Sequence, residues 1–519
     1  MGPAARAARL SRAAHDPPRS TLFRCRCDRS RCGRPRPRRI CRIDGLRRSA
    51  PPSVVHHLRA DAGGDPCLRV SRLCRGRRQT ARHVPCAGRH ARSLLGERRP
   101  PTVIRQQQQA AQKAGVDGKP LQIQRPLQEE GRELRNWWIE EMLATDQPLV
   151  ERMVLFWHNH FTSSLQKTRY PSSLYWQNGL FRAQAFGNFA TLLKSVARDP
   201  AMLIYLDGVR NVARQPNENF ARELLELFTL GEGHYSEADI KAAARAFTGW
   251  SIERDTGHFV FREPQHDGAE KSFLGQTGRF GGEDILAILL RHPRTAETIV
   301  EKLWREFVSL KPDTVEIKRL AASFRDSGYQ IKPLMRALFL SASFRDPANR
   351  GALIKSPVDL IVGTVHVLGL PVPEKTQLAR MMQGLGQNLF NPPNVKGWSG
   401  GESWITAYTL LQRQQLLRRI VEATTVSPME GTGRRADRRQ QQAAGMEDTQ
   451  QMMEPRPVEG RSLRNAGTEA RLGPTLLGVD TTTLTHTLLP RAPIDAVDTG
   501  GTPGAVVAAA LLDPAYQLK

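Results

Sequence analysis

The chain has 519 residues, of which 39% are hydrophobic and 24% charged, a composition that is normal for a globular protein with a sizeable core. Its net charge of +25 would suggest nucleic-acid binding, but residues 1–100 contain 26 Arg, no Lys and 6 Asp or Glu, and alone supply +20. The rest of the chain carries only +5, so we exclude a generally basic nucleic-acid-binding protein. The longest apolar run, Ala505–Leu512, is much shorter than the roughly 20 residues of a membrane-spanning helix, and we expect no transmembrane segment.

The first hundred residues differ from the rest of the chain. They contain all seven cysteines, show no apolar periodicity, and precede the first lysine, Lys113. Arg without Lys, mixed with Pro, Cys and Ala, is what a GC-rich coding region yields when it is translated out of frame. We therefore predict that residues 1–103 are an out-of-frame segment or a disordered basic tail. No signal peptide is visible, because Met1–Pro18 lacks an apolar core of about 7–15 residues, and the localisation stays open.

Helical periodicity dominates the middle of the chain. After a polar lead-in at 104–135, we predict a helical domain over 136–424. In Pro148–Phe161, the apolar residues Val150, Met153, Val154 and Trp157 recur at helical spacing and mark a buried face. Further helices are expected at 217–230, 240–247, 283–291, 295–310, 314–326, 331–343, 357–368, 375–386 and 404–423.

One stretch breaks this rhythm. Trp250–Leu274 is rich in Gly and aromatic residues, and Phe259–Phe261 and Lys271–Phe273 flank the turn-forming Asp267-Gly268, which predicts one small β-hairpin. Beyond the domain, we predict a disordered linker at 425–470 and a tail at 471–519 with a closing helix. The fold class is therefore mainly α: a multi-helix globular domain with one β-hairpin, flanked by disordered segments.

Several ordered motifs resemble those of a large bacterial family, the domain of unknown function 1800. They are Phe156-Trp-His-Asn-His-Phe161, Asn217-Glu-Asn-Phe-Ala-Arg-Glu-Leu224, Thr229–Tyr235, Thr248-Gly-Trp250, His266-Asp267, Pro392-Pro-Asn-Val-Lys-Gly-Trp398 and Leu511–Leu518. The resemblance covers about residues 130–423 and the extreme C-terminus. It implies a helical fold and no established activity. It also implies a protein that is often exported and often encoded beside sulfatase-like exported proteins. Such proteins normally begin with a basic, Gly-Phe-containing helical segment, which is absent here.

The triplet His158-Asn159-His160 is the first candidate site. An HNH nuclease is excluded, because its signature residues are spread over a ββα metal finger, whereas this triplet lies in a helical pattern. Residues i and i+2 of a helix point about 200° apart, so His158 and His160 cannot both face one metal ion within a regular helix. We expect His158 on the buried face, bonded to a backbone group or a carboxylate, and His160 at the boundary.

The helix at 217–230 carries the second candidate, Glu223. It lies at the edge of the apolar stripe and needs a partner, either a histidine from the helix of Trp157 or a metal ion. The same helix carries Glu218, Arg222 and Glu226 at successive i+4 steps, which predicts an ion ladder. Near its start, Asn217 and Asn219 are expected to act as caps.

The remaining candidates lie in loops. We expect His266-Asp267, with Lys271 nearby, at the hairpin tip, serving either turn geometry or chemistry. Two prolines make the segment 391–398, which contains Lys396 and Trp398, a rigid loop that forms either a structural connection or the wall of a cleft.

Two function classes remain open at this level. In the first, the chain is a hydrolase in which His158 or His160, Glu223 and the His266-Asp267 pair act, with a possible divalent metal bound by His158, Glu223 and His266. In the second, it is a non-catalytic scaffold or partner of an exported protein, and the polar residues fix the fold. Because each polar group beside an apolar stripe needs a partner, we expect His158, Glu223 and His266 to lie together.

Overall fold

The computed structural model describes residues 121–370, 373–425 and 479–519. Within these ranges helices dominate and the strands are few and short, which confirms the predicted mainly α fold. The predicted disordered or out-of-frame segment 1–103 and nearly all of the predicted linker 425–470 lie outside the described residues.

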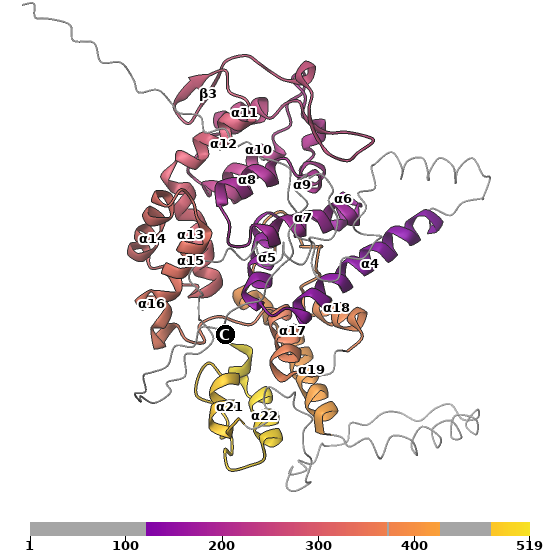
Figure 1. The fold of residues 1–519 in the computed structure, drawn as a ribbon, viewed down its shortest axis with the longest axis vertical. Helices are drawn as coiled ribbons and strands as arrows, with labels where there is room; N and C mark the ends of the chain where they lie inside the picture. Colours follow the sequence, from indigo (N-terminus) through magenta and orange to yellow (C-terminus); the bar gives the residue numbers. More distant parts are fainter. Residues whose placement is uncertain (1–120, 371–372, 426–478) are drawn as a thin grey trace, which may run out of the picture. The chain divides into compact units, whose positions relative to one another are not determined.

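The N-terminal helices lead up to a π-helical turn. They are α4 (Leu121–Ala144), α5 (Pro148–His160), α6 (Leu165–Thr168), α7 (Pro171–Ala183), α8 (Phe189–Ala197), α9 (Pro200–Tyr205), the 3₁₀ turn η1 (Gly208–Arg210), α10 (Asn219–Glu223) and the π-helix η2 (Leu224–Thr229). Helix α4 begins within the predicted polar lead-in, and α7, α8 and α9 were not predicted. Helices α4, α5 and α7 pack against one another (Figure 1).

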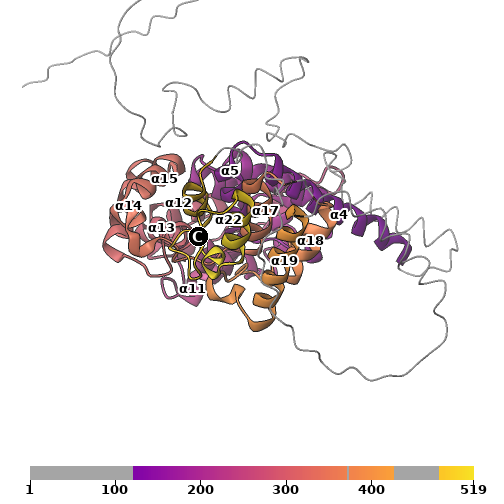
Figure 2. The same ribbon diagram turned by 90° about the horizontal axis from the view of Figure 1, so that it is seen from below.

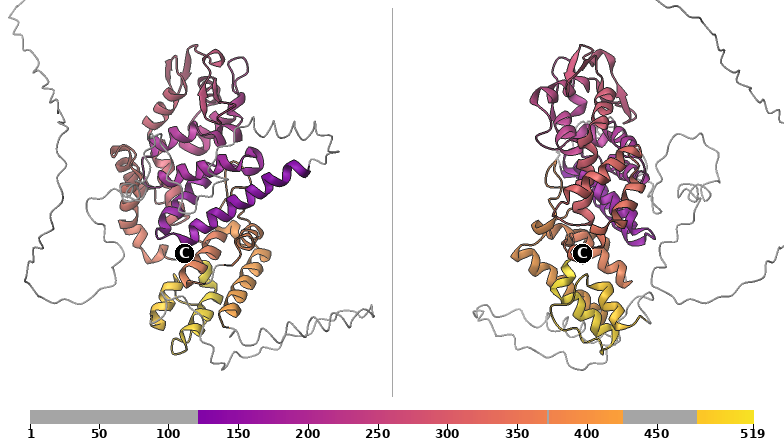
Figure 3. Two further views of the ribbon diagram at one scale, coloured as in Figure 1. Left: turned by 45° about the vertical axis from the view of Figure 1, so that its right-hand side comes forward. Right: turned by 90° about the vertical axis from the view of Figure 1, so that its left-hand side faces the viewer.

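A second run of helices follows the two small sheets. It consists of α11 (Glu237–Ala246), α12 (Gly282–Arg291), α13 (Pro293–Phe307), α14 (Thr314–Asp326), α15 (Ile331–Leu340), α16 (Ala342–Arg345), α17 (Pro357–Leu368), α18 (Lys375–Gly384) and α19 (Ala407–Thr425). Short 3₁₀ turns lie between them at η4 (Pro347–Asn349) and η5 (Gly401–Trp404). Helices α13, α14 and α15 pack in sequence, and α17 and α18 lie against α4 (Figure 3).

The predicted closing helix exists and returns to the body. Helix α22 (Pro503–Leu512), followed by η7 (Pro514–Gln517), packs against α21 (Thr481–Leu488) and α19 (Figure 2). Arg413 of α19 is fully buried and donates to the Gln517 side chain (3.2 Å) and the Lys355 carbonyl (3.0 Å). The Thr364 and Tyr516 hydroxyls are hydrogen-bonded at 2.7 Å, which ties η7 to α17.

The β region contains two hairpins, where the sequence predicted one. Strand β1 (Trp250–Ile252) pairs with β2 (Phe259–Phe261), and β3 (Lys271–Phe273) pairs with β4 (Gln276–Gly278), both antiparallel. The two predicted strands therefore do not pair with each other. Strand propensity marked both segments correctly, but each pairs with a closer neighbour across a shorter turn. His266-Asp267 consequently lies in the connection after η3 (Glu263–Gln265), not at a hairpin tip.

Local signals explain where several helices begin. Ser236 and Asp239 form a capping box at the start of α11, and Ser356 with Asp359 forms another at the start of α17, where Pro357 is the first helical residue. Large aromatic side chains fill the core, with Trp137, Trp138, Trp157 and Trp304 almost completely buried. None of the helices in the described ranges combines the length and hydrophobicity that crossing a membrane requires.

The capping box of α11 generates a test of how local and distant contacts combine. The Asp239 carboxylate accepts from the Ser236 backbone (2.8 Å) and also from the Leu274 backbone (2.7 Å) in the β3–β4 turn. Asp239→Ala removes one half of the capping box and leaves the Ser236 and Leu274 backbone N–H groups without this acceptor, so we expect the free energy of unfolding to fall by about 2–3 kcal/mol. Urea denaturation measures this loss.

A matched control is Glu316→Ala in the first turn of α14, where the carboxylate pairs with Arg319 of the same helix (2.6 Å). That exposed pair should contribute less than about 1 kcal/mol. Equal losses in the two variants would contradict the role assigned to Asp239.

Candidate functional site

His158 lies in a cage of aromatic rings. It is 1% exposed, and its ring lies between 5.2 and 6.3 Å, centroid to centroid, from Trp138, Phe181, Phe390 and Trp398. Neither ring nitrogen has a hydrogen-bond partner in the described part of the chain. Burial lowers the pKa of His158 to about 3, so the imidazole is neutral at neutral pH. The expected bond to a backbone group or a carboxylate is therefore replaced by contacts with aromatic faces and edges.

His160 points away from His158, as their spacing predicts, but it is also buried, with 5% exposed. Its Nδ1 lies 3.1 Å from Lys302 Nζ on α13. Burial, and next the positive charge of Lys302, hold the pKa of His160 well below its usual range, against an opposing contribution from the Phe228 backbone. Because a lysine ammonium only donates, Nδ1 is the acceptor and the ring proton belongs on Nε2. The expectation of a boundary position was wrong, because α5 is covered on nearly all sides.

Lys302 joins three elements. Its Nζ donates to the Leu227 carbonyl of η2 at 2.6 Å and to His160 of α5. Burial, followed by the nearby charge of Arg305, lowers the pKa of Lys302 to about 8. Sequence reasoning missed this residue, since a lysine beside the apolar stripe of α13 looks like any solvated lysine.

The end of the helix at η2 explains why such a donor is needed. The last carbonyls of a helix have no partner within it and accept from side chains, water or ligands instead. Here the Thr229 hydroxyl donates to the Leu224 carbonyl (2.6 Å). The Leu230 carbonyl, at the end of the turn, accepts from Thr298 (3.0 Å) and Arg294 (3.1 Å) of α13. Helix α13 therefore supplies the donors that stabilise η2.

The π-helix also changes the predicted ion ladder. Arg222 pairs with Glu218 (3.1 Å) as expected, but its second partner is Glu237 (2.8 Å) of α11 instead of Glu226. The change from α to π geometry at residue 224 removes the i+4 alignment between Arg222 and Glu226. Glu226 instead accepts from the Tyr235 hydroxyl (3.2 Å) and pairs with Lys396 (3.5 Å).

Glu223 is half-buried at the junction of α10 and η2. Burial, and next the charge of Glu226, raise the pKa of Glu223, while Lys396 and Arg222 oppose the shift. At the start of α10, the Asn217 side chain accepts from the Asn219 backbone (2.9 Å), as a cap does. The Asn219 side chain donates to Asp207 (3.3 Å).

His266 and Asp267 are organised around Thr248. His266 Nδ1 lies 2.9 Å from the Thr248 carbonyl, and the Asp267 backbone donates to the Thr248 hydroxyl (2.8 Å). The Asp267 carboxylate pairs with Arg245 (2.6 Å), and Arg245 holds the pKa of Asp267 below its usual value. Lys271 is buried and donates to the carbonyls of Asp267 and Ala269, and burial lowers its pKa.

The three residues expected to share one cluster have separate surroundings. His158 contacts aromatic rings, Glu223 faces charged groups of its own helix and Lys396, and His266 bonds to Thr248. Over the residues that the structure describes, no three His, Cys, Asp or Glu side chains are grouped as metal ligands.

The loop with Lys396 and Trp398 is fastened to α5. The Asn159 side chain accepts from the Trp398 backbone N–H (2.7 Å) and donates to the Trp398 carbonyl (3.3 Å). Gly397 has φ +79°, and a Cβ there would lie 2.2 Å from Asn159 Oδ1 and 2.7 Å from the Asn159 carbonyl. Only glycine permits this close approach. Lys396 extends from the same loop to Glu232 (2.9 Å).

A pocket of about 270 Å³ opens between α5, α13 and this loop. Its lining combines five residues of the sequence motifs with the lysine that the sequence did not reveal, Lys302, and with Arg305. The motif residues are Phe156, Asn159, His160, Lys396 and Trp398.

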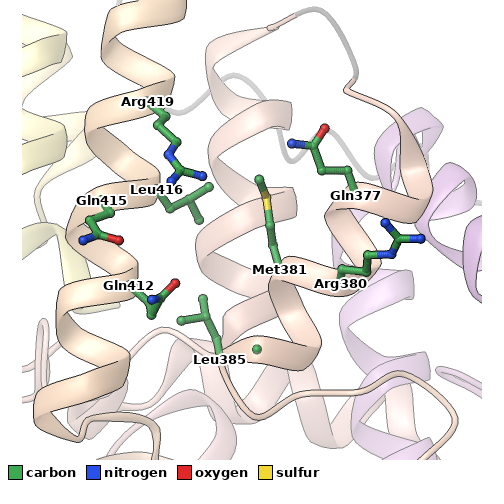
Figure 4. Close-up of a pocket in the computed structure, with 9 residues that line it drawn as sticks. Gln377, Arg380, Met381, Leu385, Gln412, Gln415, Leu416 and Arg419 are labelled. Carbon is green, nitrogen blue, oxygen red and sulfur yellow. The ribbon is translucent and has the colours of Figure 1, made fainter. Parts of the chain in front are cut away.

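Two other grooves have fewer side chains that could act in catalysis or bind a ligand. The groove between α18 and α19, of about 220 Å³, is lined by Gln, Arg, Met, Leu and Gly residues and by no histidine or carboxylate (Figure 4). A groove between α5 and α17 is largely apolar, and its Arg152 and Asp359 pair with each other.

A family model described as "Protein of unknown function (DUF1800)" matches residues 69–518. The match extends beyond residues 130–423 and the C-terminal motif. It also includes residues 69–103 of the segment predicted to be disordered or out of frame. No protein of curated function and no solved structure matches the chain.

The neutral His158 should make the fold sensitive to acid. Its folded-state pKa of about 3 is below the unfolded value of 6.5, so between these values the unfolded chain binds the additional proton. The stability that His158 contributes in its neutral form is therefore lost as pH falls from 6.5 towards 3. Between pH 7 and pH 4, we expect the wild type to lose about 3 kcal/mol more than His158→Phe, by urea denaturation at each pH. Parallel pH profiles of the two proteins would contradict this assignment.

Gly397→Ala should destabilise the fold by about 2–4 kcal/mol, because it adds a close contact with Asn159 to an unfavourable backbone conformation. Gly328→Ala is the matched control: Gly328 also has positive φ (+66°), but a Cβ there would meet nothing within 4 Å. The control should lose only about 1 kcal/mol. Thermal and urea denaturation measure both, and equal losses would refute the close-approach argument.

Proposed function

We propose that this chain, which belongs to the DUF1800 family of proteins of unknown function, is a non-catalytic helical scaffold or partner protein. The observation that carries the proposal is the use of the motif side chains. The Asn159 side chain uses both its oxygen and its nitrogen in hydrogen bonds to the Trp398 backbone, and Lys271 donates to two backbone carbonyls. The Asn159 bonds join α5 to a loop 239 residues further along the chain, and the Lys271 bonds fix the turn before β3, so both side chains are used to hold the fold.

The surroundings of the other motif residues support the same reading. Arg222 joins α10 to α11 through Glu237, and Arg245 joins α11 to the segment before β3 through Asp267. A catalytic acid or base has to be within hydrogen-bond reach of a reacting atom, and these groups are engaged with protein partners instead.

The partner in this proposal is an exported sulfatase-like protein, which the family resemblance implies. Co-expression of the two proteins followed by size-exclusion chromatography tests this point. Separate elution of both folded proteins at micromolar concentration would contradict the choice of this partner. The scaffold proposal itself would then be tested by the Asn159 and Glu223 variants described below.

One observation favours a hydrolase as the second candidate. Glu223 is half-buried, its pKa is raised, and Glu226 is close enough to contribute to that shift. A half-buried carboxyl whose pKa is raised by burial is the kind of group that general acid catalysis uses. In this alternative Glu223 is the acid, with or without a divalent metal ion.

Asn159→Ala distinguishes the two readings. It leaves the Trp398 N–H and carbonyl without their partner, so we expect the free energy of unfolding to fall by about 2–4 kcal/mol. Asn159→Asp keeps the acceptor for the N–H but places a carboxylate against the carbonyl, and it should also destabilise. Glu223→Gln should leave the melting temperature within about 2 °C of the wild type.

The same proteins are assayed with chromogenic esters, phosphate esters, sulfate esters and glycosides, with and without added Mn²⁺ or Zn²⁺. The scaffold proposal expects no turnover above buffer. Turnover by the wild type that disappears in folded Glu223→Gln would overturn it in favour of the hydrolase.

A further inference from the structure

The pocket between α5, α13 and the Lys396 loop has an excess of positive charge. Four cationic side chains line it: Lys302, Arg305, Lys396 and Lys519. Among the lining residues, Glu306 is the one acidic side chain, and Arg152 from outside the lining already pairs with it at 2.5 Å. Within the pocket Glu306 also lies 3.8 Å from Lys519, but it forms no ion pair with Lys302 or Arg305.

Two of the four cations are compensated elsewhere. Lys396 pairs with Glu232 (2.9 Å) and Glu226 (3.5 Å), and Lys519 pairs with Asp359 (2.8 Å). These lysines contribute to the field of the pocket but already have counter-charges.

Lys302 and Arg305 have no counter-charge in the described ranges. The partners of Lys302 are a backbone carbonyl and a neutral imidazole, and they use two of its three donors. Arg305 is exposed and forms no ion pair with the described residues. The two residues are three apart on α13, so they lie on the same face, and their like charges repel. A bound anion would relieve this repulsion and supply the missing counter-charge.

The walls of the pocket are aromatic and apolar. Phe156 of α5, Trp398 of the loop and Trp404 of η5 line it. The Trp398 Nε1–H is buried and has no acceptor among the described residues. A volume of about 270 Å³ suits a molecule with one ring or a short chain.

We propose that this pocket binds a small organic anion, with its phosphate or carboxylate group held by Lys302 and Arg305 and its apolar part against Phe156, Trp398 and Trp404. The pocket shares Asn159 and Trp398 with the contacts on which the scaffold proposal rests, but the proposed site uses the cations of α13 and the Trp398 ring instead of the Asn159–Trp398 backbone hydrogen bonds, so either proposal can fail without the other. The combination of a few convergent charged donors with apolar walls is the usual composition of a ligand site. Lysine and arginine are the side chains that most often hold such oxyanions.

Isothermal titration calorimetry on the full chain tests the proposal, with phenyl phosphate, benzoate, inorganic phosphate and benzyl alcohol as probes at constant ionic strength. Phenyl phosphate or benzoate should bind, and neutral benzyl alcohol should bind at least about tenfold more weakly, a difference of about 1.4 kcal/mol. Inorganic phosphate should also bind more weakly, because it makes no contact with the walls. Absence of binding by both organic anions would overturn the proposal, and equal affinity for inorganic phosphate would overturn its organic part.

Variants locate the site. Arg305→Gln and Lys302→Met should each weaken phenyl phosphate binding by about tenfold or more, while Arg336→Gln, an exposed arginine on α15 outside the lining, should leave it unchanged. Lys302→Met could fail to fold, because the wild-type lysine also donates to the Leu227 carbonyl. In that case the Arg305→Gln variant alone tests the site, since the Arg305 side chain is exposed and its loss should not affect folding. An equal loss in Arg305→Gln and Arg336→Gln would show a general charge effect and refute the site.

Discussion

The hydrogen bond from Lys302 to the Leu227 carbonyl is the interaction on which the centre of this structure depends. The Leu227 carbonyl lies in the last turn of η2, where a helix has no backbone donor of its own to offer, so a neighbouring element has to supply one. Helix α13 supplies them through Arg294, Thr298 and Lys302. Since Lys302 also bonds to His160, the same ammonium group fixes α5 against η2 and α13, and it sets the tautomer of the imidazole.

Helix α5 explains why His158, Asn159 and His160 are adjacent in the sequence. Three consecutive helical positions point in three directions about 100° apart, and each direction meets a different part of the protein. His158 enters the aromatic cage formed by α4, α7 and the loop after α18, Asn159 holds that loop, and His160 bonds to α13. A motif that looks like a metal or nuclease signature is here the set of contacts of a central helix.

Periodicity predicted most of the helices, because an apolar stripe at helical spacing requires no knowledge of the partner. It failed where partners are distant or geometry is irregular. The prediction that His160 lies at the boundary between core and solvent was wrong, because an apolar stripe indicates only one buried face of a helix and α5 is buried on more than one. The predicted ion ladder of Glu218, Arg222 and Glu226 requires uniform α-helical geometry, and the π-helix η2 interrupts that geometry. The hairpin pairing was misjudged because strand propensity does not identify the partner strand. Lys302 could not be found at all, since its contacts lie 75 and 142 residues away.

The choice of a lysine as the donor to η2 connects the fold to the pocket. A serine or threonine could cap a carbonyl without adding charge, as Thr229 and Thr298 do nearby. A lysine in this position is costly to bury, and Arg305 three residues further on adds to the cost by repulsion. Two uncompensated cations at the wall of a pocket with aromatic sides are therefore more than the fold requires. The additional charge is explained if the pocket holds an anion that completes the arrangement, so that one residue serves both the architecture and the ligand.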